Sequence, residues 1–281
     1  MVDANRFSVL VEGLDHPEGV CVDASGRLFA GGEAGQVYRI DVDEPNVAQV
    51  ASTGGFMLGL CADAGGILYC CDVGRRQMLK VDPESGSVEV YSSGTNDRKM
   101  VNPNWPAFDE TGNLYVTDSG TWKGDDGCIF RIDAAGTTSV WSEASTNFPN
   151  GSCLSVDGKS LLVLESCTPG LVRIPIQQDG SAGEREVIAE LPGSVPDGIA
   201  LDVNGNAYVC CYRPDRIYRV SAVGEVEIVA EDAEGTLLSA PTNGVFIGDD
   251  RRRFVTGNLG RWHLSVCDWG VEGLALRYPK I

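Results

Sequence analysis

Hydrophobic and polar positions alternate along this chain in short stretches that Gly- and Asp-rich turns separate. In the first repeat, residues 20–22 and 28–30 are two such stretches, with the turn 23–26 between them. Residues 37–40 and 47–51 follow as a third and a fourth. Such alternation over a few positions is typical of half-buried β-strands. We therefore expect antiparallel hairpins, with four strands to each repeat.

This hairpin pattern recurs six times. An aromatic residue or a leucine marks the second strand of every copy, 40 to 47 residues after the previous marker. The markers are Phe29, Tyr69, Tyr115, Leu162, Tyr208 and Phe254. A strand repeat of this period is typical of a β-propeller. We expect a single all-β domain, residues 1–281, folded as a six-bladed β-propeller. Because an open sheet edge invites aggregation, the N-terminal segment 7–11 is predicted to complete the last blade.

One position is equivalent in all six repeats and carries the candidate chemistry. It lies eleven or twelve residues before each marker, where a loop leads into the first strand. It holds Glu18, Leu58, Asn104, Asn150, Asp197 and Asn243. Neighbouring Pro and Gly residues are typical of such loop-to-strand junctions. Because the first strand of a blade lines the channel, these six side chains are predicted to form a ring at one mouth.

Four residues of this ring suit a metal ion. Glu18 and Asp197 offer carboxylates, and Asn104 and Asn150 offer amide carbonyls. Hard cations prefer such an all-oxygen set, so we expect Ca²⁺, with Mg²⁺, Mn²⁺ or Zn²⁺ as alternatives. The other interpretation is that these side chains cap loops or form hydrogen bonds across the channel.

The residues around the ring carry a family resemblance. The matching stretches are 17–19, 103–104, 149–151 and 196–202, with a weaker match at 241–243. They resemble the SMP-30/gluconolactonase/LRE-like family, which comprises six-bladed calcium-dependent lactonases and is related to squid-type phosphotriesterases. The resemblance covers most of the chain.

This resemblance implies a mechanism and a substrate class. Glu18, Asn104, Asn150 and Asp197 would bind one divalent cation, and Asp197 would also act in catalysis. The cation would act as a Lewis acid on a lactone or ester carbonyl. Asp197 would be the general base for the attacking water, with a role as nucleophile as the alternative. The expected partner is a small-molecule lactone or ester.

The chain also departs from the family pattern. Where relatives often have Arg-Pro-Asn-Asp, this chain has Asn102, Pro103, Asn104 and Trp105. Leu58 places an apolar side chain in the second repeat. These differences favour a less polar substrate than a sugar-acid lactone. The expected substrate-binding residues are Leu58, Trp105, Asp118, Trp122 and Asn243.

Three further features at the predicted mouth have two interpretations each. Asp72, Asp118 and Glu165 lie three residues after their markers and could form an acidic collar or simply cap turns. His16, two residues before Glu18, could assist proton transfer or stabilise its own loop. Trp122, in the Gly-rich insertion 120–127, could cover the mouth or be an ordinary loop residue.

Composition excludes several classes of partner. The net charge of −18 argues against nucleic acid and anionic membranes, which require basic patches. The longest wholly apolar run, residues 207–212, is too short to span a bilayer. The ten cysteines lie mostly in apolar strands without a C-x-x-C pair, so we expect reduced thiols and a cytoplasmic protein. We see no secretory signal and no obligate protein partner.

Two other functions remain open at this point. Blade five resembles a repeat of the NHL type, which would make the propeller a non-catalytic scaffold for a protein partner. The Pro-Glu-Gly opening at residues 17–19 also resembles strictosidine-synthase-like enzymes, which use a Glu without metal. Stabilisation by Ca²⁺ on heating would separate the first reading from these two.

Overall fold

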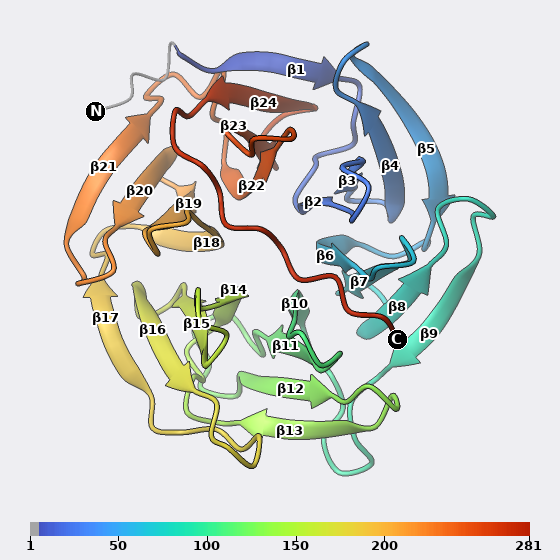
Figure 1. Cartoon of the computed structure of the whole chain (residues 1–281), viewed down its shortest axis with the longest axis vertical. Helices are drawn as coiled ribbons and strands as arrows, with labels where there is room; N and C mark the ends of the chain where they lie inside the picture. Colours follow the sequence, from blue (N-terminus) through green and yellow to red (C-terminus); the bar gives the residue numbers. More distant parts are fainter. Residues whose placement is uncertain (1–5) are drawn as a thin grey trace.

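The computed structural model describes residues 6–281, which form six four-stranded antiparallel sheets around a central axis (Figure 1). Blade 1 comprises β2 (Val20–Val22), β3 (Leu28–Gly31), β4 (Gln36–Asp41) and β5 (Asn46–Ser52). Blade 2 comprises β6 (Met57–Ala62), β7 (Leu68–Asp72), β8 (Gln77–Val81) and β9 (Val88–Ser92). Blade 3 comprises β10 (Pro103–Phe108), β11 (Leu114–Asp118), β12 (Cys128–Ile132) and β13 (Thr138–Ser142).

The second half of the chain repeats this arrangement. Blade 4 comprises β14 (Pro149–Leu154), β15 (Ser160–Glu165), β16 (Gly170–Pro175) and β17 (Glu186–Glu190). Blade 5 comprises β18 (Val195–Leu201), β19 (Ala207–Arg213), β20 (Arg216–Val220) and β21 (Val226–Glu231). Blade 6 comprises β22 (Pro241–Ile247), β23 (Arg253–Asn258), β24 (His263–Asp268) and β1 (Ser8–Glu12). The prediction of an all-β six-bladed propeller is confirmed. That residues 1–281 are one domain stays a prediction.

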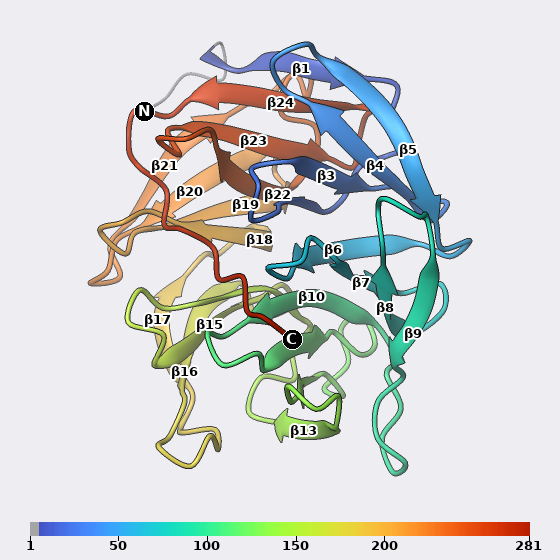
Figure 2. The same ribbon diagram turned by 45° about the vertical axis from the view of Figure 1, so that its right-hand side comes forward.

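The two ends of the chain share blade 6. Strand β1 pairs antiparallel with β24, with Ser8 opposite Val266 and Glu12 opposite His263. Figure 2 shows β1 as the outermost strand of that blade. The prediction that an N-terminal strand completes the last blade is therefore confirmed, and the ring of sheets is closed.

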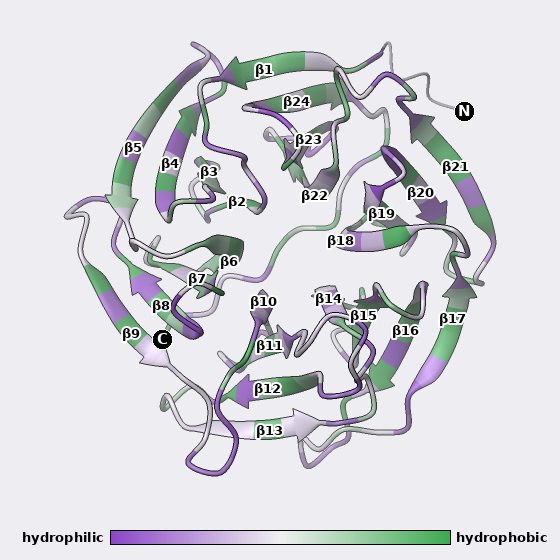
Figure 3. Cartoon of the chain, turned by 180° about the vertical axis from the view of Figure 1, so that it is seen from behind, coloured by the Kyte–Doolittle hydropathy of each residue, from purple (hydrophilic) through white to green (hydrophobic). Residues whose placement is uncertain are grey.

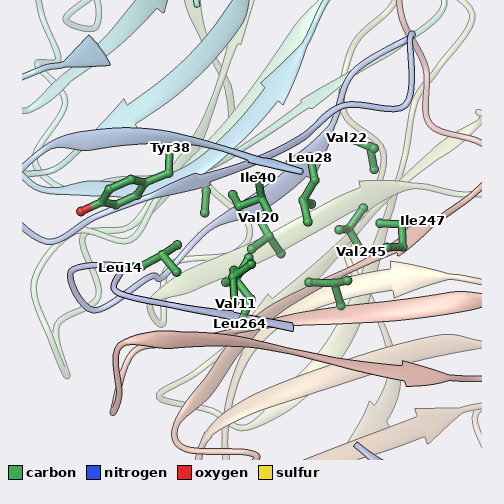
Figure 4. Close-up of a cluster of buried hydrophobic side chains, with 12 residues drawn as sticks. Val11, Leu14, Val20, Val22, Leu28, Tyr38, Ile40, Val245, Ile247 and Leu264 are labelled. Atoms are coloured by element: carbon green, nitrogen blue, oxygen red, sulfur yellow. The ribbon is translucent and has the colours of Figure 1, made fainter. Parts of the chain in front are cut away.

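The core is divided among the six interfaces between neighbouring blades. Each of six clusters of buried apolar side chains joins two adjacent blades. Figure 4 shows the cluster between blades 6 and 1, where Val20 and Leu28 meet Val245 and Leu264. Burying one such side chain contributes about 1.5–3 kcal/mol, so each blade is stabilised mainly by its neighbours.

The strands become less apolar from the axis outward. The innermost strands β10 and β22 are buried along their whole length. The outermost strands β17 and β21 carry exposed glutamates, and only one or two positions in each are buried. In Figure 3 both strands show hydrophilic as well as hydrophobic segments.

The segment that follows β24 crosses the centre of the ring (red in Figure 1). The Leu274 N–H donates to the Leu201 carbonyl at 2.8 Å. The Tyr278 hydroxyl donates to the Val22 carbonyl at 3.0 Å. Leu201 and Val22 are the last residues of innermost strands. The segment therefore crosses the mouth of the channel opposite to the one where these strands begin.

All ten cysteines are free thiols. The adjacent Cys70 and Cys71, and likewise Cys210 and Cys211, are buried and unbridged. Residues 6–281 contain no helix with the length and hydropathy needed to cross a membrane.

Candidate metal centre

The six ring residues predicted from the repeats lie side by side at one mouth of the channel. The innermost strands of adjacent blades pack against each other all the way round. The ring closes where the Thr242 hydroxyl and the Asn243 Nδ2 donate to the Glu18 carbonyl, at 2.9 and 3.4 Å. Blade 6 thus contacts blade 1 at the ring position itself.

Backbone irregularities occur at the ring positions. In blades 2 to 5 the pairing of the innermost strand with its neighbour shifts register at the ring position. The shift leaves Leu58, Asn104, Asn150 and Asp197 out of the regular ladder. A bulge of this kind re-aims a side chain away from the alternation of the strand.

Glycine follows the ring residue in five of the six blades. In blades 1, 2, 4 and 5 the next blade lies too close for a side chain at this glycine, and in blade 6 the Phe254 side chain of the same blade does. A Cβ on Gly151 would overlap the Asp197 carbonyl. A Cβ on Gly198 would overlap the Asn243 Oδ1. At these two glycines the backbone of one blade therefore lies in direct contact with the ring residue of the next blade.

The five polar ring side chains are buried, with 1–6% of their surface exposed. Within residues 6–281, four of their oxygens accept no hydrogen bond although they are inaccessible to solvent. These oxygens are the Oδ1 atoms of Asn104, Asn150, Asp197 and Asn243. A buried polar atom without a partner costs about 1–3 kcal/mol, so four at one mouth indicate a site for an electropositive group.

The two ring carboxylates are held in a strongly desolvated setting. Burial raises the pKa of the Asp197 carboxyl to about 8, although the Asn150 amide opposes the shift. Burial, and then the charge of Asp197, raise the pKa of Glu18 well above its ordinary value. Two carboxylates that disfavour each other's ionisation would both be stabilised in their charged form by a cation between them.

The ring is well suited to a hard divalent cation. Two carboxylates and the amide oxygens of Asn104 and Asn150 form an all-oxygen set, which Ca²⁺ prefers. Neither cysteine nor histidine occupies a ring position, so the set lacks the ligands that softer metals select. Leu58 offers no donor; its half-buried side chain packs on the core between blades 2 and 3.

Sequence comparison places the chain in a family. Residues 43–257 match the family described as the SMP-30/Gluconolactonase/LRE-like region. The chain belongs to the SMP-30/gluconolactonase/LRE-like family. Residues 8–40 match a second description, the N-terminal part of strictosidine-synthase-like proteins. The resemblance to this family is thereby confirmed, and the stretches 103–104, 149–151 and 196–202 lie within the matched range, whereas residues 17–19 lie in the second match.

Individual relatives are distant. A gluconolactonase of Zymomonas mobilis is 26% identical over 78% of this chain, which spans 59% of that protein's length. The lactonase drp35 of Staphylococcus haemolyticus is 24% identical over 86% of this chain and 78% of its own. A calcium-binding regucalcin from Agrobacterium tumefaciens superimposes with a TM-score of 0.78 at 17% identity, covering 99% of this chain and 97% of that one.

In this member of the SMP-30/gluconolactonase/LRE-like family, blade 3 has Trp105 after its ring residue, where the other five blades have glycine. Its indole lies directly against Gly59 of the neighbouring blade, where a Cβ would overlap the ring. Only 8% of Trp105 is exposed. It lines a cavity of about 110 Å³ whose other walls include Leu60, Phe108 and the crossing segment at Leu274. The channel behind the ring is therefore apolar.

The acidic residues after the second strands are anchored to loops. The Asp118 carboxylate accepts backbone N–H groups of Val101, Asn102 and Gly120 at 2.7–3.1 Å. Glu165 accepts the Ser145 hydroxyl at 2.7 Å and is paired with Arg185. Asp72 accepts two backbone N–H groups. These contacts match the turn-capping interpretation, and a substrate role for Asp118 stays a prediction.

Exposed aromatic side chains lie on the loops at this mouth. Trp122 is 49% exposed and packs edge-on against Phe148 with ring centroids 4.9 Å apart. Trp262, 57% exposed, packs on His16 in the same manner. Sequence reasoning gave Trp262 no role, although it occupies the loop of blade 6 that corresponds to the insertion carrying Trp122. The place of Trp122 in the substrate site stays a prediction.

His16 lies in its loop between two acids. Its Nδ1 is 3.0 Å from Asp15 Oδ1 and 3.2 Å from Glu33 Oε2. These three groups are close enough to share a metal ion, at the exposed rim rather than in the buried ring. The contacts are those of a loop-stabilising residue. His263 lies beneath a loop, 3.3 Å from the Leu237 carbonyl, and burial lowers its pKa.

Proposed function

We propose that this chain is a divalent-metal-dependent hydrolase of a lactone or a related ester. The observation that carries the proposal is a cluster of buried, unpartnered oxygens at one channel mouth, three from amides and one from Asp197. The desolvated carboxylate of Glu18 lies beside them. Ca²⁺ is the expected ion, and Mg²⁺, Mn²⁺ and Zn²⁺ are the alternatives. The gluconolactonase and lactonase names of the relatives support this reaction class.

Glu18, Asn104, Asn150 and Asp197 would hold the ion. When bound, a divalent cation polarises a carbonyl and stabilises the negative charge that develops on its oxygen. Asp197 accepts a proton from water as the water oxygen attacks the carbonyl carbon. The ester C–O bond breaks, and the alkoxide oxygen takes up the proton. The product of a lactone is a hydroxy acid.

The surroundings support a substrate that is less polar than a sugar-acid lactone. Leu58 is an apolar member of the ring, Trp105 follows Asn104 directly, and Trp122 is exposed at the mouth. Asn243 and Asp118 would supply the polar contacts. The walls are therefore suited to an alkyl or aryl group attached to a single polar reacting centre.

A metal-independent enzyme of the strictosidine-synthase-like kind is the second candidate. The match of residues 8–40, which include Glu18, favours it. Glu18 would then act alone as an acid or base, and the amide oxygens of the ring would have no ligand. A non-catalytic NHL-like scaffold for a protein partner leaves the same oxygens unexplained. Both alternatives therefore leave the buried, unpartnered oxygens of the ring without an explanation.

The chemistry of the rest of the chain supports a small-molecule enzyme of the cytoplasm. Ten free thiols suit a reducing compartment. A net charge of −18 does not favour nucleic acid or anionic membranes as partners. We propose no obligate protein partner.

The test is hydrolysis of a panel of alkyl lactones, sugar-acid lactones and aryl esters, with chelator and with added Ca²⁺. We expect turnover with Ca²⁺, loss with chelator, and loss in Asp197→Asn. Asp179→Asn, in an exposed turn, is the matched control and should keep full activity. Turnover that survives both chelator and Asp197→Asn would exclude the proposal. Turnover that survives chelator but is lost in Glu18→Gln would favour the second candidate.

A further inference from the structure

We infer that Ser119 and Ser166 are positioning residues that fix which end of two ring amides faces the channel axis. Each hydroxyl links an asparagine of the ring to the backbone of the next blade, and we call the two arrangements the serine bridges. The inference rests on the proposed metal-dependent function because it concerns the same ring.

The serine bridges have the same geometry in blades 3 and 4. Asn104 Nδ2 donates to Ser119 Oγ at 3.0 Å, and Ser119 Oγ donates to the Pro149 carbonyl at 2.8 Å. Asn150 Nδ2 donates to Ser166 Oγ at 3.1 Å, and Ser166 Oγ donates to the Pro196 carbonyl at 2.6 Å.

Donor and acceptor chemistry makes each bridge directional. A serine hydroxyl has one hydrogen, and a backbone carbonyl can only accept. The hydrogen of Ser119 is therefore used on Pro149, and its oxygen can only accept from Asn104. Only the NH₂ end of that amide can donate, so the carbonyl end must point the other way. The same reasoning applies to Ser166 and Asn150. The unpartnered Oδ1 atoms are therefore the amide ends that are turned away from the serines.

The position of the two serines in the repeat supports a specific role. They stand four residues after the strand markers, where the other blades have Glu33, Val73, Tyr212 and Asn258. A serine occurs there only in the two blades whose ring residue is an expected amide ligand. In blade 6 the Nδ2 of Asn243 is instead held by the Glu18 carbonyl.

Each bridge also ends next to the following ring residue. Pro149 precedes Asn150, and Pro196 precedes Asp197. Ser119 and Ser166 are 0% and 3% exposed, so solvent does not replace the hydroxyl. The two bridges therefore tie Asn104, Asn150 and Asp197 into one chain of contacts.

The experiment measures Ca²⁺ binding by titration calorimetry on the full chain, after chelator treatment. We expect Ser119→Ala and Ser166→Ala each to weaken Ca²⁺ binding about 10- to 100-fold, the range typical when a group that orients a metal ligand is removed. The two bridges give independent variants, so a folding failure of one leaves the other to be measured.

A double-mutant cycle separates positioning from a general structural effect. If Ser119 acts through Asn104, its removal should have little further effect on Ca²⁺ binding once Asn104 is alanine. The matched control is Ser265→Ala. Ser265 is fully buried and links Asn258 Nδ2, at 3.1 Å, to the Leu237 carbonyl outside the ring. This variant should unfold more easily and bind Ca²⁺ as the wild type does.

The outcomes distinguish the two proposals. Wild-type protein that binds none of Ca²⁺, Mg²⁺, Mn²⁺ or Zn²⁺ would overturn the proposed function and this inference with it. Wild-type protein that binds Ca²⁺ while both serine variants bind it equally well would overturn only the serine bridges. An effect no larger than that of Ser265→Ala, or additive effects in the cycle, would also overturn them.

Discussion

The backbone of Gly198 lies directly against the side-chain oxygen of Asn243, and no atom of another residue separates blades 5 and 6 at this point of the ring. A methyl group on Gly198 would overlap both the Asn243 Oδ1 and the Thr242 carbonyl. Asn243 in turn donates through Nδ2 toward Glu18 Oε2 at 3.4 Å. The glycine therefore determines where the amide lies, and the amide contacts one of the two carboxylates.

We predict that Gly198→Ala disrupts the ring from its backbone side. Overpacking typically costs about 1–3 kcal/mol of the free energy of unfolding, and because the Thr242 carbonyl is backbone, Asn243 must move. We expect a loss in that range with weaker Ca²⁺ binding, measured by urea denaturation and calorimetry. Gly65→Ala is the control, because its Cβ would approach only a side chain, at 3.2 Å. Equal behaviour of the two variants would contradict the prediction.

The raised pKa of Asp197 predicts how stability depends on pH in the absence of metal. Its pKa is 3.8 as a reference value and about 8 in the folded protein. Between these values the folded carboxyl keeps a proton that the unfolded chain releases. The contribution of Asp197 to the free energy of unfolding should therefore fall as pH rises from about 4 to about 8, and then level off. One such group gives a slope of at most ~1.4 kcal/mol per pH unit.

The measurement is denaturant unfolding in chelator at a series of pH values. Asp197→Asn should make the slope of the free energy of unfolding against pH shallower. The slope that remains is the contribution of Glu18. Added Ca²⁺ should restore stability most at the upper end of the range, where both carboxylates are ionised. A slope that is the same for wild type and variant would show that Asp197 titrates normally and that its surroundings are wetter than described.

The pairing of Glu165 with Arg185 predicts a structural role for the acidic residues after the second strands. The Glu165 side chain is 1% exposed, whereas that of Arg185 is 26% exposed. Arg185→Ala would leave a buried carboxylate without its partner, which costs about 3–5 kcal/mol for fully buried pairs and less here. We expect clear destabilisation in urea with unchanged Ca²⁺ binding. If substrate turnover changes while stability does not, Glu165 belongs to the active site instead.

The ring and the fold follow from the sequence for one reason: both repeat. A position that recurs at a fixed distance from Phe29, Tyr69 and their equivalents must occupy the same place in every blade, so Glu18 and Asp197 can be brought together without a structure. The closing strand follows from the same logic, because an unpaired edge has to be covered.

What does not repeat is missed. Ser119 and Ser166 occur in only two blades, and a serine after a strand is compatible with any turn; the spacing from Asn104 and Asn150 to these serines is the signal that could have found them. The direction of a carboxylate is equally hidden, because Asp118 in sequence looks the same whether it faces substrate or the N–H groups of Val101 and Asn102. The segment that follows β24 and crosses the channel has no periodic pattern, so the sequence does not predict the contact between Tyr278 and Val22.

Trp122 offers a test of the substrate class that is independent of the metal. Its indole is half exposed, and its known contact is the edge of Phe148, so Trp122→Ala should change the free energy of unfolding by no more than about 0.5 kcal/mol, as for most surface positions. If the indole covers the acyl group of a bound ester, KM for alkyl and aryl esters should rise several-fold, while kcat changes little because no reacting atom is touched.

Trp262→Ala, at the opposite side of the same rim, is the comparison. A rise in KM for both variants would indicate a general apolar rim. A rise for Trp122→Ala alone would assign the covering role to its loop, and no change in either would leave the apolar channel wall at Trp105 as the determinant of specificity.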